Sequence, residues 1–96
     1  MSLLKLNPIV QSEHHGYHFA DIPKGDYGTI SKIQEELLEL QDAMDQGNKI
    51  MALTELSDLY GAIEGFIERN SLGVTMRDLE IMSHATKRAF ESGHRK

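Results

Sequence analysis

The chain of 96 residues has no cysteine, no tryptophan and only two prolines. The absence of cysteine excludes a disulfide scaffold, a thiolate zinc site and a cysteine nucleophile. Bases are outnumbered, because ten Lys and Arg residues stand against fifteen Asp and Glu residues, for a formal net charge of −5. This balance argues against duplex-DNA binding through a general basic surface, and we expect no nucleic-acid polymer as a partner.

Long apolar runs are missing as well. The only apolar start is Met1–Leu4, which is followed by Lys5, Asn7 and Pro8. That stretch is too short for a signal peptide or a membrane span, so the sequence predicts a cytoplasmic protein with no membrane partner. Apolar residues make up 40% of the chain and charged residues 26%, which is typical of a soluble globular protein with one domain.

Residues 1–28 are predicted to form an irregular N-terminal arm. Both prolines and three glycines lie in it, and they allow only a short helical turn near Ile9–Glu13. The arm also carries histidines and aromatic residues, namely His14, His15, His18, Tyr17, Phe19 and Tyr27. No fourth metal ligand follows the histidines at a suitable spacing, which favours incidental surface histidines over a metal site. The aromatic side chains more often pin such an arm to the core or to a partner chain than stack on a base.

From residue 29 to residue 96 the pattern predicts an all-α domain built around three main helices. In the first helix, apolar residues recur at steps of three and four: Ile30, Ile33, Leu37, Leu40 and Met44. Gly47 and Asn48 are expected to end it.

The second helix should span about Lys49–Arg69, with Asn70–Gly73 as its terminating turn. The third should open at Thr75, whose hydroxyl can cap it while Asp78 favours the helix dipole, and should end at Ser92–Gly93.

The second helix is apolar over well over half of its circumference, at Ile50, Leu53, Leu56, Leu59, Tyr60, Ile63, Phe66 and Ile67. The third helix is expected to bury a narrower side, formed by Leu79, Met82, Ala85 or Thr86, and Phe90. Three helices of this size cannot cover the second one completely. We therefore expect a helical bundle that is completed by oligomerisation, as a homodimer or a homotetramer.

Carboxylates lie at the edges of the apolar stripes on the first two helices. Glu35, Glu36 and Glu39 share one arc of the first helix, and Glu55 and Asp58 are spaced i, i+3 on the second. Because the short link favours antiparallel packing, the two acidic edges can face each other. A hard divalent cation would relieve their repulsion, and all-oxygen ligands suit Mg²⁺, or Mn²⁺ in its place, better than zinc. A solvated acidic face is the alternative, and the residues alone leave both open.

The segment Glu35-Glu36-Leu37-Leu38-Glu39, followed after fifteen residues by Glu55-Leu56-Ser57-Asp58, resembles a known signature. It is similar to the Glu-Glu-x-x-Glu … Glu-x-x-Asp motifs of the all-α nucleoside triphosphate pyrophosphatases. These include the MazG-like proteins, the dimeric dUTPases and the phosphoribosyl-ATP pyrophosphatases. The similarity covers about Thr29–Gly93.

This resemblance implies that Mg²⁺ is held by Glu36, Glu39, Glu55 and Asp58, with Glu35 orienting or deprotonating a water molecule. It implies cleavage of a nucleotide substrate between the α and β phosphates, giving a monophosphate and pyrophosphate.

Basic side chains are needed to meet the remaining phosphates, and Lys87, Arg88 and then Lys32 are the candidates. Cations near a helix C-terminus also suit the helix dipole without any ligand, so a solvated helix end is the alternative for Lys87 and Arg88. The rival function for the whole chain is a non-catalytic acidic module for helical interaction or oligomerisation.

Overall fold

The computed structural model describes residues 20–93, and over this range the chain is all-α, as predicted. Its helices are α2 (Ile30–Asp45), α3 (Lys49–Arg69) and α4 (Met76–Glu91), with no strand between residues 20 and 93. The turn expected near Ile9–Glu13 lies outside the described residues. So do His14, His15, His18, Tyr17 and Phe19.

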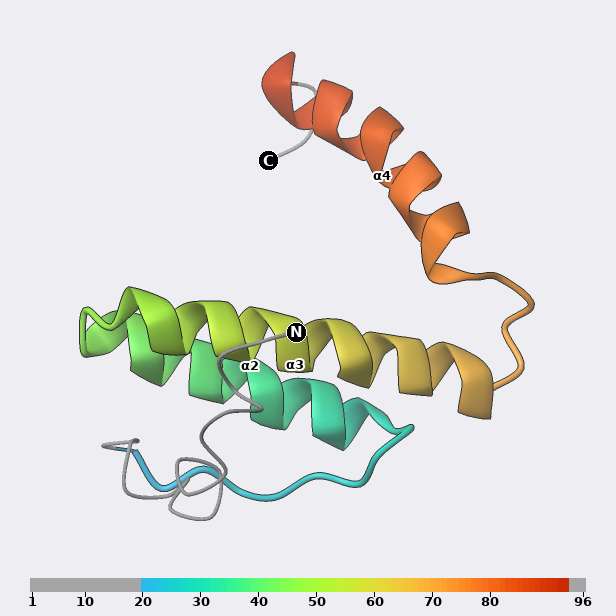
Figure 1. Ribbon diagram of the computed structural model, residues 1–96. Coiled ribbons are helices and arrows are strands. Elements are labelled where there is room, and N and C mark those ends of the chain that lie inside the picture. Colours follow the sequence, from blue (N-terminus) through green and yellow to red (C-terminus); the bar gives the residue numbers. More distant parts are fainter. Residues whose placement is uncertain (1–19, 94–96) are drawn as a thin grey trace.

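Helices α2 and α3 form an antiparallel hairpin (Figure 1). Gly47 closes the turn with a φ of 67°, a left-handed conformation that suits glycine. Asn48 then caps α3, because its side-chain oxygen accepts a hydrogen bond of 3.0 Å from the backbone N–H of Met51. The short link therefore produces the antiparallel arrangement that the sequence predicts.

Helix α4 begins with a capping box. The hydroxyl of Thr75 accepts from the backbone N–H of Asp78 at 3.1 Å, and the Asp78 carboxylate accepts from the Thr75 N–H at 2.9 Å. The helix then runs away from the hairpin (Figure 1). It packs little against α2 or α3, and none of the residues Met76–Glu91 is buried.

The arm from residue 20 to residue 28 lies along the hairpin and is tied to both of its helices. The backbone N–H of Ala20 donates to Oδ1 of Asp42 at 3.2 Å. At the other end, Arg69 donates to the carbonyl oxygen of Tyr27 at 2.8 Å, and the Tyr27 ring lies against Gly65, where a larger residue would collide with it. Tyr27 therefore pins the arm to α3, as expected.

The apolar core of the single chain is small. At the closed end of the hairpin it consists of Ala43, Met51 and Ala52, with Leu40 packed against them. The face of α2 that packs inward is mainly acidic, since Glu35, Glu36, Glu39 and Asp42 are buried with Ala43. The apolar stripes expected to form the core are thus largely exposed in one copy of the chain. Between residues 20 and 93, no helix combines the length and apolar character that crossing a bilayer requires.

Candidate metal centre

Four carboxylates converge where the middle of α2 crosses α3. Glu36 and Glu39 come from α2, Glu55 and Asp58 come from α3, and one oxygen of each lies within 4.8 Å of the others. Residues spaced i, i+3 share a helix face, so each helix contributes one pair to the cluster. The facing acidic edges predicted from the sequence are therefore present, and we call these residues the four-carboxylate cluster.

The cluster is unusual because most of it is buried. Glu36, Glu39 and Glu55 are 5%, 2% and 2% exposed, and only Asp58 reaches the surface. Burial, followed by the nearby charges of Glu39 and Asp58, raises the pKa of Glu36 to about 7. Burial also raises the pKa of Glu55 to about 9, with further contributions from a hydrogen bond and charge at Glu39. The side chains therefore repel one another strongly when all are ionised.

The donor set fits a hard divalent cation. Every donor is a carboxylate oxygen, which Mg²⁺ and Mn²⁺ prefer over the softer ligands of zinc. Oε1 of Glu36 is buried and accepts no hydrogen bond from any residue between 20 and 93. A buried acceptor without a donor costs free energy, and a bound cation would remove that cost. The cluster can thus hold a metal ion, and the chemistry of its ligands favours a hard one.

Glu35 is also buried, but it has different partners from the cluster. Its Oε1 accepts from the backbone N–H of Gly25 at 2.8 Å and from Lys32 at 3.1 Å, while Lys24 lies 3.7 Å from Oε2. Burial alone would raise the pKa of Glu35, but the hydrogen bond from Gly25 and the two lysines lower it below its ordinary value. Glu35 is therefore held as an anion that faces the arm.

Lys32 bridges Glu35 and the cluster. Its ammonium nitrogen is 3.1 Å from Oε1 of Glu35 and 3.4 Å from Oε2 of Glu36. Partial burial works against its charge, but the two carboxylates prevail and raise the pKa of Lys32 above its ordinary value. Of the three bases predicted from the sequence to meet phosphates, Lys32 is the one that lies beside the carboxylates.

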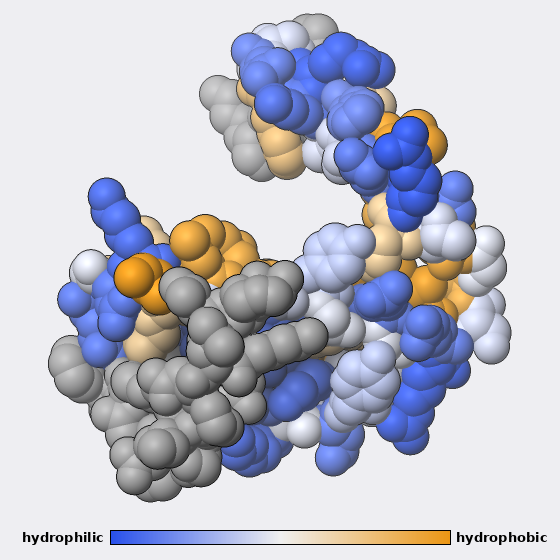
Figure 2. Space-filling model, viewed as in Figure 1, coloured by the Kyte–Doolittle hydropathy of each residue, from blue (hydrophilic) through white to orange (hydrophobic). Residues whose placement is uncertain are grey.

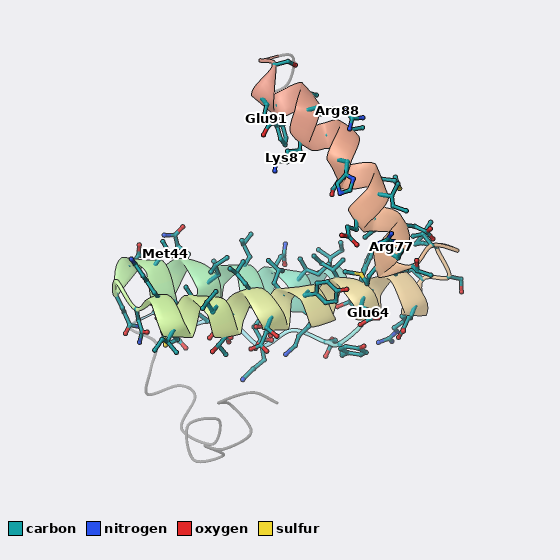
Figure 3. All side chains as sticks on the ribbon, turned by 45° about the horizontal axis from the view of Figure 1, so that its top comes forward. Met44, Glu64, Arg77, Lys87, Arg88 and Glu91 are labelled. Atoms are coloured by element: carbon teal, nitrogen blue, oxygen red, sulfur yellow. The ribbon has the colours of Figure 1, made fainter. Side chains whose placement is uncertain are left out.

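Lys87 and Arg88 are not brought to the cluster of their own chain. Figure 3 shows both side chains in the half of α4 that lies farther from the hairpin. Both residues are exposed, and α4 makes little contact with the helices that carry the carboxylates.

Two residues near the site were not expected from the sequence. Asp42 is buried and holds the arm through Ala20, and Lys24 reaches Glu35 from the arm. Asp42 follows Glu39 at a spacing of three and so lies on the same side of α2. This spacing could have predicted that Asp42 is close to the site. Lys24 lies in irregular backbone, where no periodicity indicates a neighbour.

Comparison with known proteins gives no family model, no curated protein and no solved structure that matches this chain. The fold and the four-carboxylate cluster therefore carry the functional argument.

Proposed function

We propose that the protein is a Mg²⁺-dependent nucleotide pyrophosphohydrolase, which cleaves a nucleoside triphosphate or a related nucleotide between the α and β phosphates. The observation that carries the proposal is the convergence of Glu36, Glu39, Glu55 and Asp58 within 4.8 Å. They derive from two ordered motifs similar to those of the all-α nucleoside triphosphate pyrophosphatases. Three of the four are buried, and a purely solvated acidic face has no reason to bury them.

Each residue has a distinct role in this proposal. Glu36, Glu39, Glu55 and Asp58 hold the metal ion. When bound, Mg²⁺ supplies charge neutralisation at phosphate oxygens and lowers the pKa of a coordinated water molecule. Lys32 is close enough to Glu36 to meet a phosphate oxygen beside the metal site. For Glu35, the resemblance implies a role in orienting or deprotonating water, and its contacts add the role of fixing the arm next to the site.

The test is incubation with Mg²⁺ and a broad panel of normal and modified nucleotides, with pyrophosphate and orthophosphate measured separately. We expect pyrophosphate and a monophosphate as products. Glu55→Gln should abolish turnover because it removes one ligand charge from the buried cluster. Glu64→Gln is the matched control, since Glu64 is an exposed glutamate on the same helix and lies outside the cluster. Absence of turnover with every nucleotide would overturn the enzymatic proposal.

A non-catalytic interaction module is the second candidate. The specific observation in its favour is the exposure of large apolar side chains on the hairpin and on α4. Such a module requires no metal. It would be supported if the parent protein turned over no nucleotide and the Glu55→Gln variant still bound the same partner as the parent.

A further inference from the structure

Lys32 occupies a position on α2 where a base is not favoured. It is the third residue of the helix, which begins at Ile30, and no acid accompanies it in the first turn. The amino end of a helix carries partial positive charge, so a cation is destabilised there. The Lys32 side chain is also only 28% exposed, and burial adds a further cost to its charge. Interactions with other groups must offset both costs.

Two buried carboxylates supply these interactions. The ammonium nitrogen of Lys32 lies 3.1 Å from Oε1 of Glu35 and 3.4 Å from Oε2 of Glu36, one turn further along the helix. The arm borders this group, because Lys24 reaches Glu35 from it. In Figure 2 the coloured surface on the lower side of the hairpin, along which the arm runs in Figure 1, is mostly hydrophilic. Lys32 therefore stands between Glu35, which holds the arm, and Glu36, which belongs to the four-carboxylate cluster.

Glu36 depends on Lys32 more than Glu35 does. Glu35 also accepts a hydrogen bond from the backbone N–H of Gly25 and has Lys24 beside its second oxygen. By contrast, Oε1 of Glu36 is buried and accepts no hydrogen bond from any residue between 20 and 93, while its Oε2 contacts Lys32. Burial, and then its acidic neighbours, raise the pKa of Glu36 to about 7, and the charge of Lys32 acts in the opposite direction. The cluster therefore feels the charge of Lys32 directly through Glu36.

We propose that Lys32 is the counter-ion of the metal-free four-carboxylate cluster and that it competes with the divalent cation for Glu36. The inference rests on the metal site of the proposed function. A cation bound by the cluster and an ammonium group 3.4 Å from one of its ligands repel each other, and partial burial leaves this repulsion poorly screened. Lys32 thus stabilises the metal-free protein and lowers its affinity for the metal.

Metal binding also changes what Lys32 can do. An ammonium group has three N–H donors, and those that are no longer directed at Glu36 become available to an oxygen of a phosphate group. The contact of 3.1 Å with Glu35 keeps the side chain beside the cluster meanwhile. Occupation of the cluster therefore presents a phosphate-binding base at its edge, and the same base is engaged by Glu36 while the cluster is empty of metal.

A purely structural role for Lys32 predicts the opposite effect on the metal. If the ammonium group only held Glu36 in the right place to bind the cation, its removal would weaken Mg²⁺ binding. If it competes with the cation, its removal must strengthen Mg²⁺ binding, because a neighbouring positive charge disappears. The sign of the change in affinity therefore distinguishes the two roles.

The first experiment measures Mg²⁺ binding to the full chain by isothermal titration calorimetry, without any nucleotide. Lys32→Met removes the charge and keeps the length of the side chain, and it should lower the Kd for Mg²⁺ on the order of tenfold. Lys32→Gln, which keeps an N–H donor for Glu35, is a second uncharged variant and should shift the Kd in the same direction. Lys32→Arg keeps the charge and should bind Mg²⁺ as the parent does. Lys49→Met is the matched control, since it removes the same charge from an exposed residue at the start of α3.

The outcomes separate this inference from the proposed function. An unchanged or higher Kd in both uncharged variants would overturn the competition, and so would a Lys32→Arg that binds as tightly as Lys32→Met. The metal site would survive either result. If the parent protein bound no Mg²⁺ at all, the metal site, the proposed function and this inference would fall together.

The second experiment measures unfolding by urea, with Mg²⁺ and with NaCl of matched ionic strength. In NaCl, Lys32→Met should unfold at a lower urea concentration than the parent, because the buried carboxylates lose their counter-ion. In Mg²⁺ this difference should narrow, because a ligand stabilises the folded state more when it binds more tightly. Lys49→Met should follow the parent in both salts. A difference between Lys32→Met and the parent that is the same or larger in Mg²⁺ would contradict the proposal.

Discussion

The backbone N–H of Gly25 donates a hydrogen bond of 2.8 Å to Oε1 of Glu35, and this bond joins the arm to α2 beside the four-carboxylate cluster. Glu35 has almost no contact with solvent, and the remaining donors that surround it are the ammonium groups of Lys32 and Lys24. A charged carboxylate in such a setting is stabilised by its donors, and removing it leaves them unmatched.

We predict that Glu35→Ala destabilises the folded protein by roughly 1–3 kcal/mol, because the N–H of Gly25 and the ammonium of Lys32 lose their acceptor. Glu35→Gln keeps an oxygen acceptor for Gly25 and should be destabilised less. Thermal unfolding followed by circular dichroism measures the difference, with the exposed Glu68→Ala as control. Equal loss in the two Glu35 variants would contradict the assigned hydrogen bond. Loss of turnover in a well-folded Glu35→Gln would favour the role in activating water.

Mg²⁺ should stabilise the protein well beyond the effect of ionic strength. Binding to the folded state adds RT ln(1 + [L]/Kd), about 2.7 kcal/mol at a hundredfold excess over Kd. For a domain of this size that raises Tm by on the order of 10–20 °C. NaCl of equal ionic strength only screens exposed charges and should do much less. Differential scanning calorimetry with each salt provides the comparison.

The same measurement on Glu55→Gln tests the ligand set. Without Mg²⁺ this variant should be at least as stable as the parent near neutral pH, because burial raises the pKa of Glu55 to about 9 and the carboxyl must take up a proton on folding, which an amide does not. With Mg²⁺ it should show no additional shift, whereas the exposed Glu64→Gln should retain the full one. A parent protein that responds equally to MgCl₂ and matched NaCl would rule out the metal site.

The metal-free protein should lose stability as the pH rises above the ordinary glutamate range. The pKa of Glu36 and that of Glu55 are raised on folding from 4.5 to about 7 and about 9, so the folded state binds more protons than the unfolded state between these limits. Stability from these groups is thus fully present below a pH of 4.5 and is lost as the pH rises through the higher values. We expect a lower Tm at about pH 8 than at about pH 5, and a weaker pH dependence in Glu55→Gln. An unchanged pH dependence in that variant would exclude Glu55 as its source.

Lys32 should contribute more to catalysis than Lys87 or Arg88 if the bases that contact the substrate phosphates belong to the same chain as the four-carboxylate cluster. Losing one charge-assisted contact costs about 1.5–3 kcal/mol, so Lys32→Ala should lower kcat/KM roughly 10- to 150-fold. If Lys87 and Arg88 meet phosphates, Lys87→Ala and Arg88→Ala should also lower kcat/KM, without loss of helicity. Wild-type kinetics in both α4 variants would assign these bases to the solvated helix end.

Local periodicity was sufficient to predict the three helices and the cap at Thr75, because these depend on residues a few positions apart. Together with the short link, which favours antiparallel packing, it also predicted that the acidic edges of α2 and α3 can face each other, while the resemblance singled out Glu36, Glu39, Glu55 and Asp58 among them. The acidic cluster was therefore visible in the spacing of its residues.

Periodicity did not predict which side of each helix the single chain buries. It marks the stripe of Leu37 and Met44 as apolar, but the side of α2 that contacts α3 and the arm carries Glu35 and Asp42 instead. The contacts of Glu35 with Gly25 and of Asp42 with Ala20 link a helix to irregular backbone, for which no repeating pattern exists. The position of Lys87 likewise depends on how α4 leaves the hairpin, which the sequence of α4 does not encode.

The ties between the arm and the end of α3 have a consequence for the order of folding. Arg69 binds the carbonyl of Tyr27, and Asn70 binds that of Gly28 at 3.1 Å, across 42 positions of sequence in each case. The α2–α3 hairpin closes a much shorter loop, so it should form first and at a lower entropic cost. The arm can dock only after both helices are in place. The part of the arm that contains Lys24 and Gly25, beside the carboxylates, is therefore the last to reach its place. Amide hydrogen exchange should show faster exchange at the Gly25 N–H than at the amides in the centre of α3.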